Sequence, residues 1–216
     1  MLFLAVFCGF LAEYKLEHVI EHNREKEYIK SMYEDLRQDT TEINRAISVI
    51  SDYGYKSDTL LNMLEKPISK SQNELMLLYK LQYSLGAESA TLSQRTLAQL
   101  KNAGGSRLIR NKGVADGLSL YDSKAQYLSA IFKSYDEVST MVLNAARAIF
   151  DNRYIRHNFQ GDIITLLTYD QSTIRQYANS LHTYQAVGNY YVGYLQQHKK
   201  FAIELMSSIK KSYQLE

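Results

Sequence analysis

The chain has few of the residue types that mark several common classes of fold. Its 216 residues include one cysteine, one proline and no tryptophan. A single cysteine excludes both an internal disulfide framework and a cysteine-rich zinc module. A single proline favours long uninterrupted helices, because proline is the strongest helix breaker. The length corresponds to one domain, or to one domain with an appendage.

An excess of charge of one sign is also missing. Lys and Arg together number 25, and Asp and Glu together number 23. This balance argues against a nucleic-acid-binding protein, whose binding domain is normally strongly basic. Hydrophobic residues make up 45% of the chain, so it can bury a core and is not disordered by composition.

Residues 1–12 (MLFLAVFCGFLA) carry no charge and form the first shift in composition. They are fewer than the ~20 residues that a helix needs to span a bilayer. A secretory signal peptide would need a basic start and a small-residue cleavage site, which are absent, and Phe7 stands where a lipoprotein signal needs a small residue. A buried core helix is a further alternative. We favour a membrane helix, truncated here if the reading frame begins upstream.

Residues 13–28 follow as a charged juxtamembrane stalk. No Gly or Pro occurs between Glu13 and Arg37, so the apolar segment is expected to continue directly into this helix. The basic residues near the membrane end all follow the apolar segment: Lys15, Arg24, Lys26 and Lys30. The positive-inside rule then predicts a single-pass membrane protein with a cytoplasmic soluble domain.

The last segment has the clearest helical pattern, with eleven positions spaced alternately by three and four residues. Only Gly188 and His198 interrupt its apolar character, in the series Ile174, Tyr177, Leu181, Tyr184, Gly188, Tyr191, Leu195, His198, Ala202, Leu205 and Ile209. The pattern predicts a helix of about 40 residues with a coiled-coil-like seam. Asp170 or Thr168 can cap its start, and Thr168 with Gln171 matches a capping box.

The first soluble helix repeats this theme. An apolar residue recurs every seven positions, at Ile29, Leu36, Ile43 and Ile50. Among the positions interleaved with this repeat, Asp39 is the one that is not apolar. Gly54 is a potential bend, and the helix is expected to end near Lys66, because Pro67 disfavours helical geometry in the residue before it.

Three further helical stretches separate these two helices. Capping-box matches at Ser71 and Thr91 predict two short helices, and apolar spacing predicts a long helix over about 114–149. The segment 151–169 has no steady period and is expected to be a connection with a helical turn around 163–167. No stretch alternates long enough to predict a strand. Residues 29–216 are therefore expected to form an all-α, antiparallel helical bundle.

One stretch matches a metal-site pattern. His18, Glu21 and His22 spell H-x-x-E-H, which in some zinc hydrolases supplies two metal ligands and a base. A third ligand has no candidate in the sequence, and Glu and His are common in charged helices. We therefore favour a structural role for these residues and expect no enzyme, metal or cofactor.

Three other groups of residues are candidates for binding. Tyr184, Tyr191 and His198 lie on the last seam and can line a pocket or an interface, although core positions are the simpler interpretation. Basic residues of the last helix can face anionic lipid or solvent: Lys199, Lys200, Lys210 and Lys211. A small basic cluster after Gly104 and Gly105 can bind an anion, or can be a solvated turn: Arg107, Arg110 and Lys112.

Three stretches carry a family resemblance. The opening FLAVFCGFLAEYKLEHVIEHNREKEYIKSMYEDLRQD has an apolar run ending in Ala-Glu, followed by Glu-His-x-x-Glu-His-x-Arg-Glu. The others are Thr96–Leu100 through Tyr121, and the ending from Ala202 to Tyr213. Together they resemble a bacterial family of small, membrane-anchored, all-helical proteins of unknown function. The resemblance implies anchoring in the bacterial inner membrane, and because members have a longer apolar segment, it also supports a truncated start.

These observations predict a non-enzymatic scaffold, assembly factor or accessory subunit of a membrane complex. Its partners would be the membrane and other membrane or helical proteins, including a second copy of the chain, and no nucleic acid. The alternative is a sensor or signal-transmitting module, in which a ligand changes helix packing.

Overall fold

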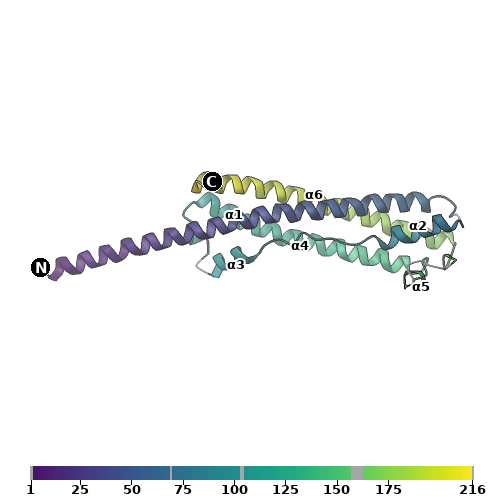
Figure 1. Ribbon diagram of the computed structural model, residues 1–216, viewed down its shortest axis with the longest axis horizontal. Helices are drawn as coiled ribbons and strands as arrows, with labels where there is room; N and C mark the ends of the chain where they lie inside the picture. The colour runs from purple at the N-terminus through teal and green to yellow at the C-terminus, as the bar shows by residue number, and fades with distance from the viewer. Residues whose placement is uncertain (1, 69, 103–104, 157–162, 216) are drawn as a thin grey trace. The chain divides into compact units, whose positions relative to one another are not determined.

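The computed structural model describes residues 2–68, 70–102, 105–156 and 163–215. Its regular elements are helices (Figure 1), which confirms the all-α class: α1 (Leu2–Leu64), α2 (Gln72–Tyr83), α3 (Arg95–Asn102), a 3-10 helix η1 (Gly105–Leu108), α4 (Lys112–Ala146), α5 (Arg153–Arg156) and α6 (Gln171–Tyr213). Within the described ranges, the extended pairing is limited to one isolated antiparallel bridge between Phe150 and Leu166.

The chain forms two compact units, and each long helix contributes to both. Unit 1 contains Met1–Glu42, Thr91–Ala125 and His198–Glu216, and unit 2 contains Ile43–Ala90 and Gln126–Gln197. Within each unit, α1 and α4 run in the same direction and α6 runs opposite to them (Figure 1). The expected antiparallel arrangement is therefore found between α6 and each of the other two helices, whereas α1 and α4 are parallel.

The heptad and seam positions form the cores of the units. Ile29, Leu36 and Ile43 are completely buried, and Ile50 is nearly so. All eleven seam positions of α6 are buried, including Gly188 and His198. Because the apolar residues recur at the helical period, their burial removes one continuous stripe of each helix from water. The core of unit 1 combines α1, α3, α4 and α6 in one cluster: Ile29, Met32, Leu36, Leu97, Leu100, Ile109, Val114, Ala115, Leu118, Tyr121, Ala202, Leu205 and Ile209.

Unit 2 has a tyrosine-rich core with internally satisfied hydroxyl groups. The rings of Tyr135 and Tyr184 stack with centroids 5.3 Å apart. Tyr135 donates a hydrogen bond of 2.9 Å to the Tyr184 hydroxyl, which itself donates one of 2.6 Å to the carbonyl oxygen of Gly86. Tyr191 packs beside Tyr135, with ring centroids 6.0 Å apart. Tyrosine is tolerated at these seam positions because each buried hydroxyl finds a partner.

The long helices begin and end close to the predicted residues. α1 continues through Gly54 without interruption and ends at Leu64. At the start of α6, the N-cap is Asp170, because its carboxylate accepts a 2.8 Å hydrogen bond from the backbone N–H of Thr173. Thr168 instead accepts a bond from the N–H of Asp170, so the capping box expected at Thr168 is wrong.

Two predictions for the shorter segments are also corrected. α3 begins at Arg95 rather than at Thr91, because its first backbone bond runs from Ala98 to the carbonyl of Gln94. Residues 163–167 form no helical turn. The side chain of Gln72 accepts from the N–H of Ile164 at 2.7 Å and donates to its carbonyl at 3.1 Å, which holds the segment extended.

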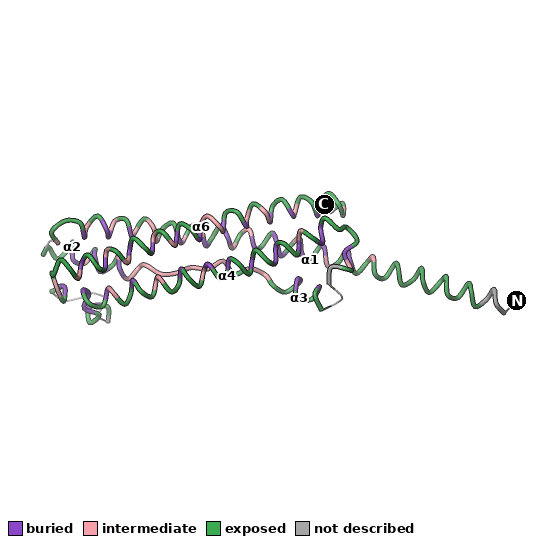
Figure 2. Tube along the Cα trace, turned by 180° about the vertical axis from the view of Figure 1, so that it is seen from behind, coloured by how far each residue is buried: buried purple, intermediate pink, exposed green. Residues whose placement is uncertain are grey.

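The first turns of α1 have little contact with the rest of unit 1. All residues from 6 to 21 are exposed, and burial begins at His22 and Glu25, within the predicted stalk (Figure 2). In the part of the chain that the structure describes, no helix has a stretch long and apolar enough to cross a membrane. The membrane segment at residues 1–12 stays a prediction.

Candidate functional site

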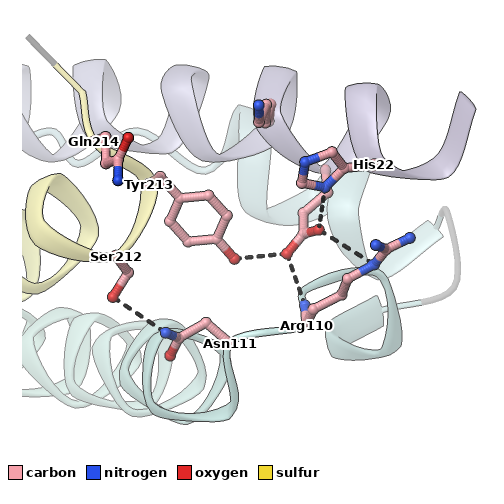
Figure 3. A pocket seen from close by; sticks show the side chains of 8 residues that line it. His22, Arg110, Asn111, Ser212, Tyr213 and Gln214 are labelled. Atoms are coloured by element: carbon pink, nitrogen blue, oxygen red, sulfur yellow. Dashed lines mark hydrogen bonds and ion pairs between the residues drawn. The ribbon is translucent and has the colours of Figure 1, made fainter. Parts of the chain in front are cut away.

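The candidate site in unit 1 is built around a buried carboxylate. The side chain of Glu25 is 2% exposed. Its Oε1 accepts two hydrogen bonds, of 2.7 Å from the backbone N–H of Arg110 and of 2.6 Å from the hydroxyl of Tyr213 (Figure 3). Glu25 therefore joins α1 to the turn before α4 and to the last residue of α6. A buried charge needs such partners, because an unpaired carboxylate in a core is strongly unfavourable.

The side chains of Arg110 and His22 approach the other carboxylate oxygen. Arg110 Nε lies 3.6 Å from Glu25 Oε2, and His22 Nδ1 lies 3.5 Å from it. Both separations exceed normal hydrogen-bond lengths, so the contact is electrostatic and leaves the oxygen weakly bonded. A terminal nitrogen of Arg110 also donates to the backbone carbonyl of His18 at 3.3 Å.

Local sequence explains how these residues meet. Glu25 precedes Ile29 by four positions, so it lies on the same buried face of α1. Asn111 is the N-cap of α4, because its Oδ1 accepts a 3.0 Å bond from the N–H of Val114. The same Asn111 donates to the hydroxyl of Ser212 at 3.1 Å, which fixes the turn beside the end of α6.

A pocket of about 330 Å³ opens beside Glu25. Figure 3 shows side chains from α1, from the turn before α4 and from the end of α6 directed around it. Its lining residues are His22, Glu25, Lys26, Arg110, Asn111, Ser212, Tyr213 and Gln214. Burial, and then the hydrogen bond to Glu25, raises the pKa of Tyr213, so its hydroxyl stays protonated and donates to the carboxylate. The pocket combines neutral hydrogen-bonding groups with charged groups of both signs.

The structure does not assemble the H-x-x-E-H pattern into a ligand set. His18 and Glu21 are exposed, and His22 is half-buried. His22 lies beside the carboxylate of Glu25, three residues along the helix, rather than that of Glu21. Among the residues that the structure describes, no group of three or more His, Cys, Asp or Glu side chains could hold a metal ion.

The other predicted site residues are distributed over both units. Tyr184 and Tyr191 belong to the core of unit 2, whereas His198 belongs to the core of unit 1, and each is 2% exposed. On α6, Lys199 is partly buried and the other three lysines are exposed: Lys200, Lys210 and Lys211. Their contact with lipid stays a prediction. Of the basic cluster, Arg110 lines the pocket, and Gly104 lies outside the described residues.

A second buried polar group lies elsewhere in unit 1. Asp39 accepts hydrogen bonds of 2.6 Å from the hydroxyl of Tyr121 and 2.7 Å from the backbone N–H of Ser93. Burial raises the pKa of Asp39, and these two bonds partly offset that rise. These two hydrogen bonds explain why Asp39 replaces an apolar residue in the heptad pattern. A leucine at this position would leave the N–H of Ser93 and the hydroxyl of Tyr121 unpaired.

Sequence reasoning missed Glu25, although a signal was present. An acidic residue one turn before the first heptad isoleucine lies on the core face, where a charge requires a partner. Comparison of the chain with protein-family models, with curated proteins and with solved structures found no match. The family resemblance of the sequence therefore stays a prediction, and function is inferred from the geometry of the molecule.

Proposed function

We propose that the protein is a membrane-attached helical bundle that acts as a non-enzymatic scaffold, assembly factor or accessory subunit of a membrane complex. Attachment is through the apolar first turns of α1, at the bacterial inner membrane. The bundle lies on the cytoplasmic side, because basic residues follow the apolar segment.

The observation that carries this proposal is the uncovered apolar start of α1. Its large side chains are about half exposed or more: Val6 51%, Phe7 54%, Phe10 66% and Leu11 46%. Burying a side chain of this kind is worth about 1.5–3 kcal/mol. Contiguous exposed apolar surface is typical of sites that contact a membrane or another protein. Residues 2–12 extend about 16 Å as a helix, which is enough to enter the hydrocarbon layer.

A separate surface on unit 2 supports the scaffold role. Tyr127 and Tyr190 are 51% and 52% exposed. Both pack on Tyr194, with ring centroids 5.4 Å and 4.8 Å away. The hydroxyls of Tyr190 and Tyr194 are 3.1 Å apart. Clustered tyrosines are enriched in protein interfaces, because they offer large apolar area and a polar tip at low entropic cost.

Membrane fractionation with a matched pair of variants tests the attachment. Replacing Phe7 and Phe10 together by serine should move the protein from the membrane to the soluble fraction. Replacing Ile163 and Leu167 together by serine is the control, because these side chains are also exposed, at 79% and 58%, but lie in unit 2. Equal partitioning of both variants with the wild type would contradict the proposal.

The partner and the topology are tested separately. Detergent-solubilised membranes should yield the tagged protein with one or more bound proteins, and substitution of Tyr190 by serine should reduce their recovery. Recovery of the chain always alone and monomeric would end the scaffold proposal. A reporter fused after Glu216 should give a cytoplasmic signal, and an extracytoplasmic signal would overturn the orientation.

A ligand-responsive sensor is the second candidate function. The observation in its favour is that Glu25 connects α1 to both Arg110 and Tyr213 beside a pocket. A ligand that competes for these contacts would change the packing of α1 within unit 1.

A further inference from the structure

The pocket beside Glu25 retains hydrogen-bond donors that the protein does not use. Lys26 lines the pocket and has no ion-pair partner among the described residues. His22 Nδ1 is buried and faces Glu25 Oε2 at 3.5 Å, so it belongs to the contact with the carboxylate. Arg110 uses its backbone N–H, its Nε and one terminal nitrogen, and its other terminal nitrogen makes no hydrogen bond within the part of the chain that the structure describes. A ligand that accepts hydrogen bonds would therefore find two donor side chains, Lys26 and Arg110, beside one cavity.

The charges of these side chains indicate the class of ligand. Lys26 and Arg110 contribute two positive charges, and Glu25 contributes one negative charge, so the lining has a net charge of one positive unit. A phosphate monoester carries about −1.5 to −2 charges at pH 7 and offers three strong acceptor oxygens. We propose that this pocket binds inorganic phosphate or a phosphate monoester, held by Lys26 and Arg110.

Glu25 sets the geometry of the site rather than blocking it. Its Oε1 is fully occupied by the N–H of Arg110 and the hydroxyl of Tyr213. The guanidinium itself is held by its 3.3 Å hydrogen bond to the carbonyl of His18 and by the approach of its Nε to Glu25 Oε2 at 3.6 Å. An anion would bind on the outer side of Arg110.

The size of the pocket agrees with a small ligand. A volume of about 330 Å³ lies at the lower end of the range of ligand sites, which is about 300–1,000 Å³. The neutral groups of Asn111, Ser212 and Gln214 complete the lining and can contact the ester portion. The phosphate can come from a free metabolite or from the headgroup of a lipid with a terminal phosphate. The inference stands independently of the proposed membrane attachment.

Calorimetric titration of the 216-residue protein with inorganic phosphate and with glycerol 3-phosphate tests the site. Saturable binding is expected, and Lys26→Gln should weaken it by about tenfold or more, since a charge-assisted hydrogen bond is lost. Lys26 is exposed and unpaired, so this variant should fold. Lys30→Gln is the matched control, because Lys30 is an exposed lysine one turn further along α1 that does not line the pocket.

Two further measurements sharpen the result. Glu25→Gln removes the nearby negative charge and should tighten phosphate binding. Phosphatidylcholine vesicles with and without phosphatidic acid identify the source, because the phosphatidic acid increment should be lost in Lys26→Gln if a lipid headgroup is the ligand. Absence of saturable binding to every phosphate probe, or an equal loss in Lys30→Gln, would overturn the inference. The free-phosphate titration needs no membrane, so its failure is distinct from failure of membrane attachment.

Discussion

The imidazole of His198 stacks on the phenol ring of Tyr121, with ring centroids 4.4 Å apart and 22° between the ring planes. His198 is 2% exposed, and neither ring nitrogen has a hydrogen-bond partner among the described residues. Burial, and then the nearby charge of Lys124, lowers the pKa of His198 to about 4. The folded protein therefore keeps this imidazole neutral, at the expense of two unpaired polar atoms in the core.

Replacing His198 by phenylalanine should stabilise the protein at pH 7 by about 1 kcal/mol. The substitution keeps an aromatic ring against Tyr121 and removes two buried nitrogens whose desolvation is not offset. Urea unfolding measures the change. His182→Phe is the control, because His182 is an exposed residue of the same helix and its substitution should have little effect. A destabilised His198→Phe variant would show that the nitrogens are bonded in solution.

The stability of the wild type should have an acid-sensitive component from His198. Its pKa is about 4 in the folded protein, against an ordinary value of 6.5, so between these values the unfolded chain binds a proton that the folded protein does not. This contribution is complete above pH 6.5 and is lost as the pH falls toward 4, by up to about 3 kcal/mol.

Asp39 acts in the opposite direction over an overlapping pH range. Its pKa is raised by burial, so its protonation favours the folded state as the pH falls. Asp39 is present in both His198→Phe and the wild type, so its contribution cancels when the unfolding free energies of the two proteins are subtracted. That difference should grow between pH 7 and pH 4, and a constant difference would contradict the assignment to His198.

The sequence pattern located the core but not the contacts between distant segments. Periodicity alone placed every seam residue of α6, and it marked Gly188, His198 and Asp39 as exceptions. Each exception has a physical cause that involves another helix. Glu25 shows the limit most clearly, because its hydrogen-bond partners lie 85 and 188 residues away along the chain. Helical period carries no information about such pairs, since they depend on how the helices are arranged.

The same limit applies to the connection before α6. The lack of a steady hydrophobic period over 151–169 predicts a connection, with a helical turn around 163–167. The backbone there is instead held by Gln72, and by Tyr79, whose hydroxyl donates to the carbonyl of Thr165 at 2.7 Å. Tertiary hydrogen bonds of this kind override weak local preference.

A double-mutant cycle at Asp39 and Tyr121 should give a coupling energy of about 1.5–3 kcal/mol. Their 2.6 Å hydrogen bond is buried and its acceptor is a carboxylate, which is the stronger class of hydrogen bond. Tyr121→Phe, Asp39→Asn and the double variant should be compared by urea unfolding at pH 7. Additive effects of the two single variants would show that the bond contributes little to stability.

Alanine substitutions at two glycines of α6 should change stability in opposite directions. Alanine normally stabilises a helix interior by about 0.5–1 kcal/mol relative to glycine. At Gly193 an added Cβ would meet nothing within 4 Å, so Gly193→Ala should show this gain.

At Gly188 the added Cβ would lie 3.2 Å from a ring carbon of Tyr135. That ring is 1% exposed and is held by its 2.9 Å hydrogen bond to Tyr184, so it has little room to withdraw. Overpacking costs about 1–3 kcal/mol and exceeds the gain in helix propensity, so Gly188→Ala should destabilise the protein by about 1 kcal/mol. Thermal and urea unfolding of both variants check the sign. Stabilisation by both would show that Tyr135 moves aside, and the close contact would then not explain why glycine occupies a seam position.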